Sequence, residues 1–226
     1  MLLAVAGVSA AAELKPFDAS FTVVWRGMSA GTANLSLKKI DGERWRYESN
    51  NAARGIFKVA LPGAITQSSD LRIEDGRIVP LHFITDDGTQ KGKDDADVTF
   101  DWSRGRATGN AEGKPVDAPL QPGVQDTLSV QIALIHELLA GRTPTSFVLL
   151  DGNEVKDYEY AAEGKERVET VLGPQETLRY RSRRPGSDRS TVFWCAPALG
   201  YLPVKVERHR GSKVDWSMTI TALKRD

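Results

Sequence analysis

The densest group of side chains that could bind a metal is a run of acidic residues near the middle of the chain. Calcium sites use several carboxylate oxygens that converge on one point. The ordered ligands, glycine and terminal glutamate of an EF-hand loop are missing here, and Lys91 and Lys93 would partly neutralise the negative field. We therefore interpret the run as a solvated hairpin loop and expect no metal site. Its members are weak cation ligands at best: Asp86, Asp87, Asp94, Asp95 and Asp97.

The catalytic residues of common hydrolases cannot be assembled from this sequence. There is no G-x-S-x-G nucleophile motif, and only His82, His136 and His209 could supply an imidazole base. The one cysteine, Cys195, lies in the apolar run FWCAP, whereas a reactive thiolate needs an electropositive, partly exposed setting. Clustered zinc ligands and a glycine-rich phosphate loop are also missing. We predict no catalytic residues, no cofactor and no enzymatic activity.

An apolar segment at residues 55–64, GIFKVALPGA, lies between two predicted strands. One interpretation is a short helix or loop that folds onto the core. The other is an apolar lip at the mouth of a curved sheet, where it would contact lipid or another apolar ligand. Four residues of this segment and three of a predicted helix form the hypothetical ligand-binding set: Ile56, Phe57, Val59, Leu61, Leu128, Ile132 and Ile135.

Side chains along most of the chain alternate between apolar and polar with a period of two, which is typical of half-buried strands. Phe21, Val23 and Trp25 alternate in this way, and Asp41-Gly42 has the composition of a tight hairpin turn. Long helices do not alternate with these strands, as a parallel sheet would require. We therefore predict a mainly β fold, an antiparallel meander that forms a curved sheet, half-barrel or incomplete barrel.

One amphipathic helix interrupts the strand pattern at residues 126–140. Asp126 can accept hydrogen bonds from the free amides of the first turn. Leu128, Ile132 and Ile135 recur at helical spacing and form part of a broad apolar stripe. Such a stripe needs a surface to cover. We expect the helix to pack on the concave face of the sheet.

Composition and charge exclude several classes of protein. The chain has 226 residues, of which 40% are hydrophobic and 27% charged, as in ordinary globular proteins. Basic and acidic residues number 30 each, so no nucleic-acid partner is expected, because phosphate binding needs concentrated positive charge. We predict a single β-rich domain over residues 13–226. Frequent glycine and proline predict a loop connection at residues 107–123.

The first 12 residues, MLLAVAGVSAAA, are small and apolar. They resemble the hydrophobic region and cleavage site of a secretory signal peptide, with Ala10 and Ala12 at the A-x-A positions. The basic region that normally precedes it is missing, which N-terminal truncation would explain; a buried N-terminal strand or helix is the alternative. The segment is too short to span a bilayer, which takes about 20 apolar residues. We expect export to the periplasm and no transmembrane segment.

The C-terminal segments FWCAP at residues 193–197 and LGYLPVK at residues 199–205 resemble the closing signature of the exported bacterial DUF3108 family (domain of unknown function 3108). Residues 71–83 resemble its central hairpin, and residues 168–178 the strand pair before the signature. The resemblance covers most of residues 17–223 and implies an exported, β-rich protein with no established activity. A looser resemblance in fold extends to periplasmic lipoprotein carriers, whose curved sheets hold acyl chains under a helical lid.

Three functions follow as hypotheses. The leading one is a periplasmic binding or envelope-assembly protein that holds an apolar or lipid-like ligand in a β half-barrel. The alternative is an interaction module that binds an envelope protein through strand edges or through residues 107–123. The third is a hydrolase of envelope polymers that uses the carboxylates of residues 86–97.

Overall fold

The computed structural model describes residues 13–225. The predicted signal peptide at residues 1–12 lies outside the described residues. Within the described part of the chain, no helix is both long enough and apolar enough to cross a bilayer.

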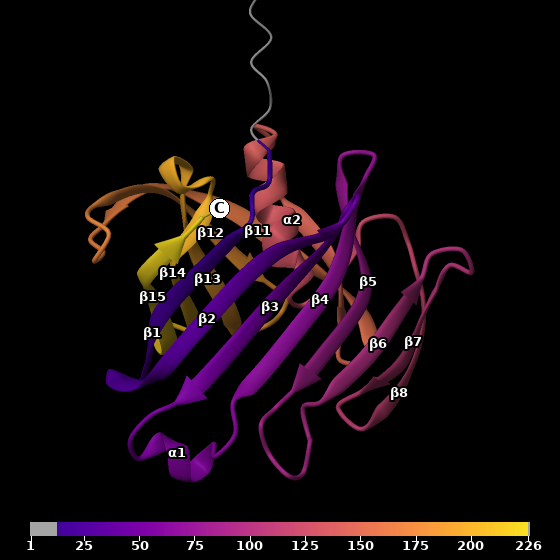
Figure 1. Ribbon diagram of the computed structural model, residues 1–226, viewed down its shortest axis with the longest axis horizontal. Coiled ribbons are helices and arrows are strands. Elements are labelled where there is room, and N and C mark those ends of the chain that lie inside the picture. Colours follow the sequence, from indigo (N-terminus) through magenta and orange to yellow (C-terminus); the bar gives the residue numbers. More distant parts are fainter. Residues whose placement is uncertain (1–12, 226) are drawn as a thin grey trace, which may run out of the picture.

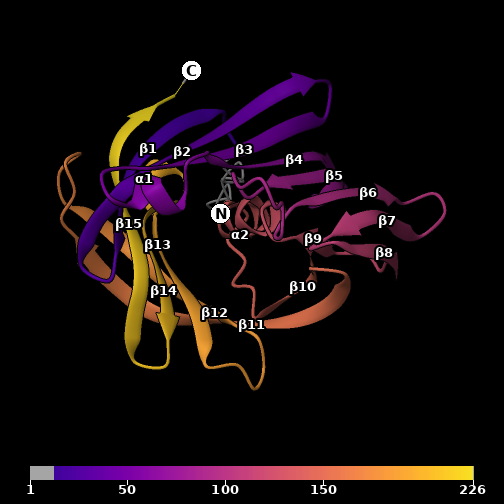
Figure 2. The ribbon, with the colours of Figure 1, turned by 90° about the horizontal axis from the view of Figure 1, so that it is seen from below.

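The described residues form one 15-stranded sheet that curves around a central helix (Figures 1 and 2). The first eight strands are β1 (Phe17–Trp25), β2 (Met28–Asp41), β3 (Arg44–Ala53), β4 (Ile65–Glu74), β5 (Arg77–Asp86), β6 (Ala96–Asp101), β7 (Arg106–Ala111) and β8 (Lys114–Pro119). The others are β9 (Val124–Asp126), β10 (Ser146–Asp151), β11 (Glu154–Val168), β12 (Gln175–Arg183), β13 (Arg189–Ala196), β14 (Leu202–Arg210) and β15 (Lys213–Lys224).

The sheet is an antiparallel meander, as predicted. Consecutive strands pair from β1 to β8 and from β9 to β15, and β1 pairs with β15. Only the short β9 is parallel to its neighbour, β10. The edge strands β8 and β9 do not pair with each other, so the barrel is incomplete. The side-chain amide of Gln125 in β9 donates a hydrogen bond of 2.8 Å to the carbonyl oxygen of Ile78 in β5.

The barrel has two different ends (Figure 1). The α1 end carries the short helix α1 (Phe57–Ala60), together with the β1–β2 and β14–β15 turns. The α2 end carries the C-terminal end of helix α2 (Ser129–Leu139) and the β11–β12 turn.

The prediction of a loop connection at residues 107–123 is wrong. Most of this stretch forms β7 and β8, which pair as an antiparallel hairpin. Ala107, Ala111 and Val116 are buried on the inner face. Small residues such as alanine give little contrast with their polar neighbours, so the period of two is hidden in the sequence.

Alternation in the strands places the core inside the barrel. Phe21 in β1 pairs with Ala33 in β2, and both side chains are fully buried. The next pair faces outward, where the Ser20 hydroxyl donates a hydrogen bond of 2.8 Å to the side-chain oxygen of Asn34. Because successive strand residues point to opposite faces, one apolar series lines the lumen throughout the meander.

Helix α2 lies inside the curved sheet (Figure 2), which confirms the predicted packing. It begins three residues later than the predicted start of residues 126–140. The buried residues of α2 lie on most of its circumference, so the helix is embedded in the core: Ser129, Val130, Ile132, Ala133, Leu134, Ile135 and Leu138.

Asp126 anchors the start of α2, as predicted, and joins it to the sheet. One carboxylate oxygen accepts hydrogen bonds from the amides of Leu128 and Ser129, at 2.8 and 2.6 Å. The other accepts a hydrogen bond of 2.7 Å from the hydroxyl of Ser69 in β4. Burial raises the pKa of Asp126, although these hydrogen bonds act in the opposite direction.

Further polar contacts fix the rest of the helix. The Tyr47 hydroxyl donates a hydrogen bond of 3.0 Å to the side-chain oxygen of Gln131. At the α2 end, the His136 ring and the Arg142 guanidinium reach the carbonyl oxygen of Gly76, at 3.1 and 3.4 Å. The helix therefore cannot slide along the lumen without breaking these hydrogen bonds.

We predict that Asp126→Ala lowers the free energy of unfolding by about 3 kcal/mol, because three buried donors lose their acceptor. Ser69→Ala should cost about 1 kcal/mol, since Asp126 keeps two backbone donors. Urea unfolding followed by circular dichroism measures both. Equal losses for the two variants would show that the carboxylate is not the anchor.

Candidate functional site

A cavity of 590 Å³ occupies the α1 end of the barrel. Strands β1 to β4 and β15 form its walls, α1 lies beside it, and the first turn of α2 borders it through Gln131. We call residues 55–64, which contain α1, the α1 segment. Most of the cavity lining is apolar and comes from inward-facing strand positions and from the α1 segment: Val23, Trp25, Leu35, Phe57, Leu61, Ile65, Trp216 and Met218.

The polar part of the lining is uncharged. Ser49, Asn51, Gln67 and Gln131 border the cavity, and none of the described residues that line it has an ionisable side chain. Asn51 donates a hydrogen bond of 2.9 Å to the Ser49 hydroxyl, and Gln67 donates one of 3.3 Å to Thr85. Such a site can hold an apolar chain and hydrogen-bond an uncharged polar group, as small-molecule sites commonly do.

A glycine in the cavity wall allows two neighbouring strands to approach closely. Gly31 pairs with Val23 on one side and with Ala53 on the other. A Cβ atom at Gly31 would lie 2.1 Å from the carbonyl oxygen of Ala52, closer than any side chain can approach. Glycine therefore permits this close contact between β2 and β3 and puts no side chain into the lumen.

The four predicted residues of the α1 segment lie together at the α1 end. Phe57 and Leu61 line the cavity, and the Phe57 ring packs edge-on against Trp25, with 5.7 Å between ring centroids. Ile56 and Val59 point into solvent and are 75% and 88% exposed. Each interpretation therefore holds for two of the four residues. Phe57 and Leu61 fold onto the interior, and Ile56 and Val59 form an exposed lip.

The three predicted residues of α2 lie elsewhere. Leu128, Ile132 and Ile135 are buried in the core and do not line this cavity, whereas their polar neighbour Gln131 does. Sequence reasoning also missed Trp216 and the other strand residues of the lining. Alternation predicts that they face inward, but it does not reveal which part of the lumen the helix leaves empty.

The acidic run forms a self-contained loop between β5 and β6. Ligand oxygens of Asp86, Asp87 and Asp95 lie within 4.8 Å of one another. Backbone amides already bind all three carboxylates, including the Asp87 amide, which donates to Asp95 at 2.8 Å. Hydrogen bonds from Thr89 and from the Asp94 amide lower the pKa of Asp87, which is the opposite of what a general acid requires.

The other two acidic candidates do not complete a cluster. Asp97 lies 2.7 Å from the ring of His82 on the neighbouring strand. Asp94 borders a second cavity of 270 Å³, which shares Ile65 and Gln67 with the first. The five residues therefore divide into a hydrogen-bonded loop and separate surface contacts.

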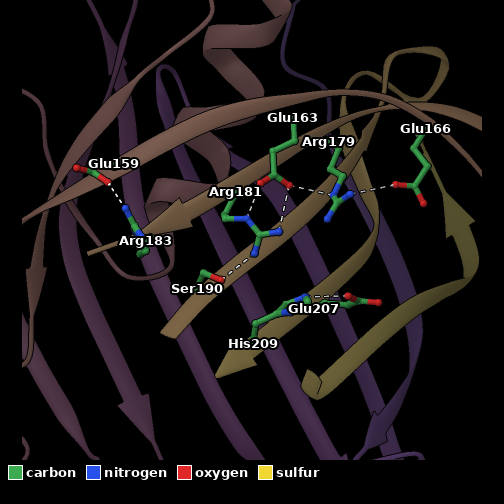
Figure 3. A network of polar contacts seen from close by, with 9 residues as sticks. All are labelled: Glu159, Glu163, Glu166, Arg179, Arg181, Arg183, Ser190, Glu207 and His209. Carbon is green, nitrogen blue, oxygen red and sulfur yellow. Dashed lines mark hydrogen bonds and ion pairs between the residues drawn. The ribbon is translucent and has the colours of Figure 1, made fainter. Parts of the chain in front are cut away.

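A network of polar contacts, which includes several ion pairs, lies on β11 to β14 (Figure 3). Glu163 contacts Arg181 at 2.5 Å and Arg179 at 3.1 Å, and Arg181 donates a further hydrogen bond to Ser190. The pairing with Arg181, followed by that with Arg179, lowers the pKa of Glu163. Arg179 also lies over the ring of the buried Trp194. The network therefore joins strands and covers an aromatic side chain, with each cation matched by a carboxylate.

Cys195 lies within the core and has no exposed surface. Burial raises the pKa of its thiol to about 12, so the thiolate is scarce at neutral pH. Its strand, β13, is buried on both faces from Val192 to Ala196. The signature segment that contains Cys195 thus contributes to packing.

We expect Glu163→Gln to destabilise the protein near neutral pH by about 0.5–1 kcal/mol, the usual range for a partly exposed pair. Because the folded-state pKa is lowered, the contribution is present above the unfolded-state pKa of about 4.3 and disappears as the pH falls through the folded-state value. Urea unfolding over a pH series measures it, with Glu159→Gln as the control in a more exposed pair. A difference from wild type that persists in strong acid would contradict this assignment.

The Cys195 thiol should not react with Ellman's reagent in the folded protein, because the reagent needs an accessible thiolate. In denaturant, one equivalent per chain should react, since the sequence has one cysteine. Rapid reaction of the native protein would show that β13 opens or that the thiol is activated.

Two solved structures resemble this fold. A β-barrel-like protein of the DUF1849 domain of unknown function from Brucella abortus matches 95% of this chain and 99% of its own, at 12% identity and a TM-score of 0.62. A candidate exported protein with a YmcC-like fold from Bacteroides fragilis covers 94% of this chain and 97% of its own, at 11% identity. Its TM-score of 0.36 is too low to support an argument. At these identities the first match shows the fold alone.

No curated protein matches the chain. The sequence profile of DUF3108, a family described as proteins of unknown function, matches residues 20–212. That range covers most of the chain and includes every lining residue of the cavity except Trp216 and Met218, which belong to β15. It also confirms the resemblance seen in the C-terminal signature. The chain belongs to the DUF3108 family.

Proposed function

We propose that this protein is a non-catalytic binding protein that holds the apolar part of a lipid-like ligand in the cavity at the α1 end. The observation that carries the proposal is the lining of the 590 Å³ cavity, which is mainly aliphatic and aromatic and includes no ionisable side chain. Cavities of about 300–1,000 Å³ with a few polar groups are typical small-molecule sites.

The energetics favour an apolar ligand. Burial of apolar surface contributes about 25 cal/mol per Å², so a chain that buries about 200 Å² would gain about 5 kcal/mol before the costs of association. A charged group would lose its hydration in this lining and find no counter-ion there. The uncharged amides of Gln67 and Gln131 can instead hydrogen-bond a hydroxyl, ester or amide.

A periplasmic site of action is part of this proposal. It rests on the leader-like sequence of residues 1–12, which has the apolar and small residues of an export signal. An apolar molecule that crosses the aqueous periplasm needs a protein cavity to shield it from water, which fits the lumen of this barrel.

Strand addition is less well supported. Of the two sheet edges, β9 has three residues and is held against β5. The other edge, β8, has six residues, and two of them are prolines, which have no amide hydrogen to donate. Short edges that contain proline are poor templates for another strand.

We predict that Val23→Trp weakens the binding of the apolar fluorophore phenylnaphthylamine by at least about tenfold, which corresponds to about 1.4 kcal/mol. Val23 lines the cavity, so the indole would occupy space that the probe needs. Fluorescence titration measures the affinity, and energy transfer from Trp25 and Trp216 places the bound probe near the lining.

Val24→Trp is the matched control. Val24 is the next residue in β1, pairs with Ser217 and points to the opposite face of the sheet. It should bind the probe as wild type does. Equal binding by both variants, or no binding by the wild-type protein, would refute the proposed site.

A further inference from the structure

The α1 end carries a concentration of exposed apolar side chains. Ile56 and Val59 are 75% and 88% exposed, Met28 is 47% exposed and Trp25 is 38% exposed. They belong together, because Trp25 pairs with Met28 across the β1–β2 turn and stacks edge-on against Phe57 of α1. We call Trp25, Met28, Ile56 and Val59 the apolar lip. Large exposed apolar patches on soluble proteins mark sites that contact another protein or a membrane.

Cations lie directly beside the apolar lip. Arg54 precedes the α1 segment, and its amide donates a hydrogen bond of 2.8 Å to Ala30 at the start of β2. Lys58 lies within α1, between Phe57 and Val59, and both cations are exposed. Within residues 13–225, neither has a carboxylate oxygen within 4.0 Å. Arg26 lies over the Trp25 ring and is only 4.0 Å from Asp215.

Apart from Asp215, acidic groups near the α1 segment lie in the loop between β5 and β6. Gly63, which follows α1, approaches the backbone of Gly88 closely. The loop that contains residues 86–95 therefore lies beside the C-terminal end of the α1 segment. The carboxylates of Asp87 and Asp95 there are directed at backbone amides of their own loop. Within residues 13–225, the charges of Arg54 and Lys58 are therefore not neutralised by ion pairs, whereas Arg26 lies 4.0 Å from Asp215.

We propose that the apolar lip docks onto an anionic lipid surface, with Ile56 and Val59 inserted among the lipid chains and Arg54 and Lys58 at the level of the headgroups. Interfacial binding by short apolar segments depends on this combination of buried apolar area and attraction to anionic lipids. The lip continues into the cavity through Phe57, so docking would bring the cavity opening to the membrane. This inference does not rest on the proposed ligand, because Ile56 and Val59, the residues proposed to insert, do not line the cavity.

Vesicle flotation tests the proposal. Wild-type protein should float with vesicles that contain equal parts of phosphatidylcholine and phosphatidylglycerol and remain unbound with phosphatidylcholine alone. Ile56→Asp combined with Val59→Asp should lower the partition coefficient by at least about tenfold. Arg54→Gln and Lys58→Gln should each lower it by about fivefold, and high salt should have a similar effect on the wild type.

Val171→Asp is the matched control. Val171 is 72% exposed, but it lies in the β11–β12 turn at the α2 end, so its partition coefficient should equal that of wild type. Circular dichroism and thermal melting establish that each variant is folded. Val23→Trp should also float like wild type, which separates docking from ligand binding.

Three outcomes would overturn the proposal. The first is that wild-type protein fails to float with the anionic vesicles, and the second is that it floats equally with the neutral ones. The third is that the Ile56→Asp, Val59→Asp variant floats as well as Val171→Asp. If the lip instead joined two copies of the chain, sedimentation would show a dimer that this double variant splits, without flotation of the wild type.

Discussion

The buried attachment of α2 inside the barrel is the constraint on which the rest of the structure depends. Asp126 binds the first amides of the helix and the hydroxyl of Ser69, so one carboxylate fixes where the helix begins and which strand it faces. Gln131 then bonds to Tyr47 across the lumen. Buried donors and acceptors that lose their partners are costly, and α2 is thereby confined to one half of the barrel.

The position of α2 explains the asymmetry of the lumen. In the half that it occupies, helix and strand side chains pack into a continuous core. In the other half, the walls still present inward-facing apolar residues, but α2 does not fill the space between them, and a cavity remains. Apolar surface left in contact with water is unfavourable, so this half of the barrel is suited to bind an apolar molecule. The neighbouring lip extends the same surface outward through Ile56 and Val59.

Several features could be predicted from the sequence because they follow from local patterns. Alternation in segments such as Phe21 to Trp25 predicted the strands. Asp41-Gly42 predicted a hairpin turn, which the structure confirms. Asp126 was recognisable as a helix cap because a carboxylate at that position has backbone amides to bind. The segment that contains Ile56 and Phe57 was recognisable because apolar residues there fitted no strand.

Other features depend on contacts between distant residues and could not be predicted in this way. The pairing of β1 with β15 joins the two ends of the chain, and the lining residue Trp216 comes next to Trp25 only through that pairing. The hairpin of β7 and β8 was missed because alanine and glycine give a weak alternation signal. Leu128, Ile132 and Ile135 were expected at the cavity, but the helix turns them into the core.

The measurement that tests this account most directly is the location of a bound apolar probe by NMR. Intermolecular NOEs between phenylnaphthylamine and methyl groups of the cavity wall, such as those of Met218 and Ile65, are the predicted result. NOEs to Ile132 of α2 would mean that the probe displaces the helix and that the open half of the lumen is not the site. Absence of NOEs to any cavity methyl group at saturating probe would contradict the account equally.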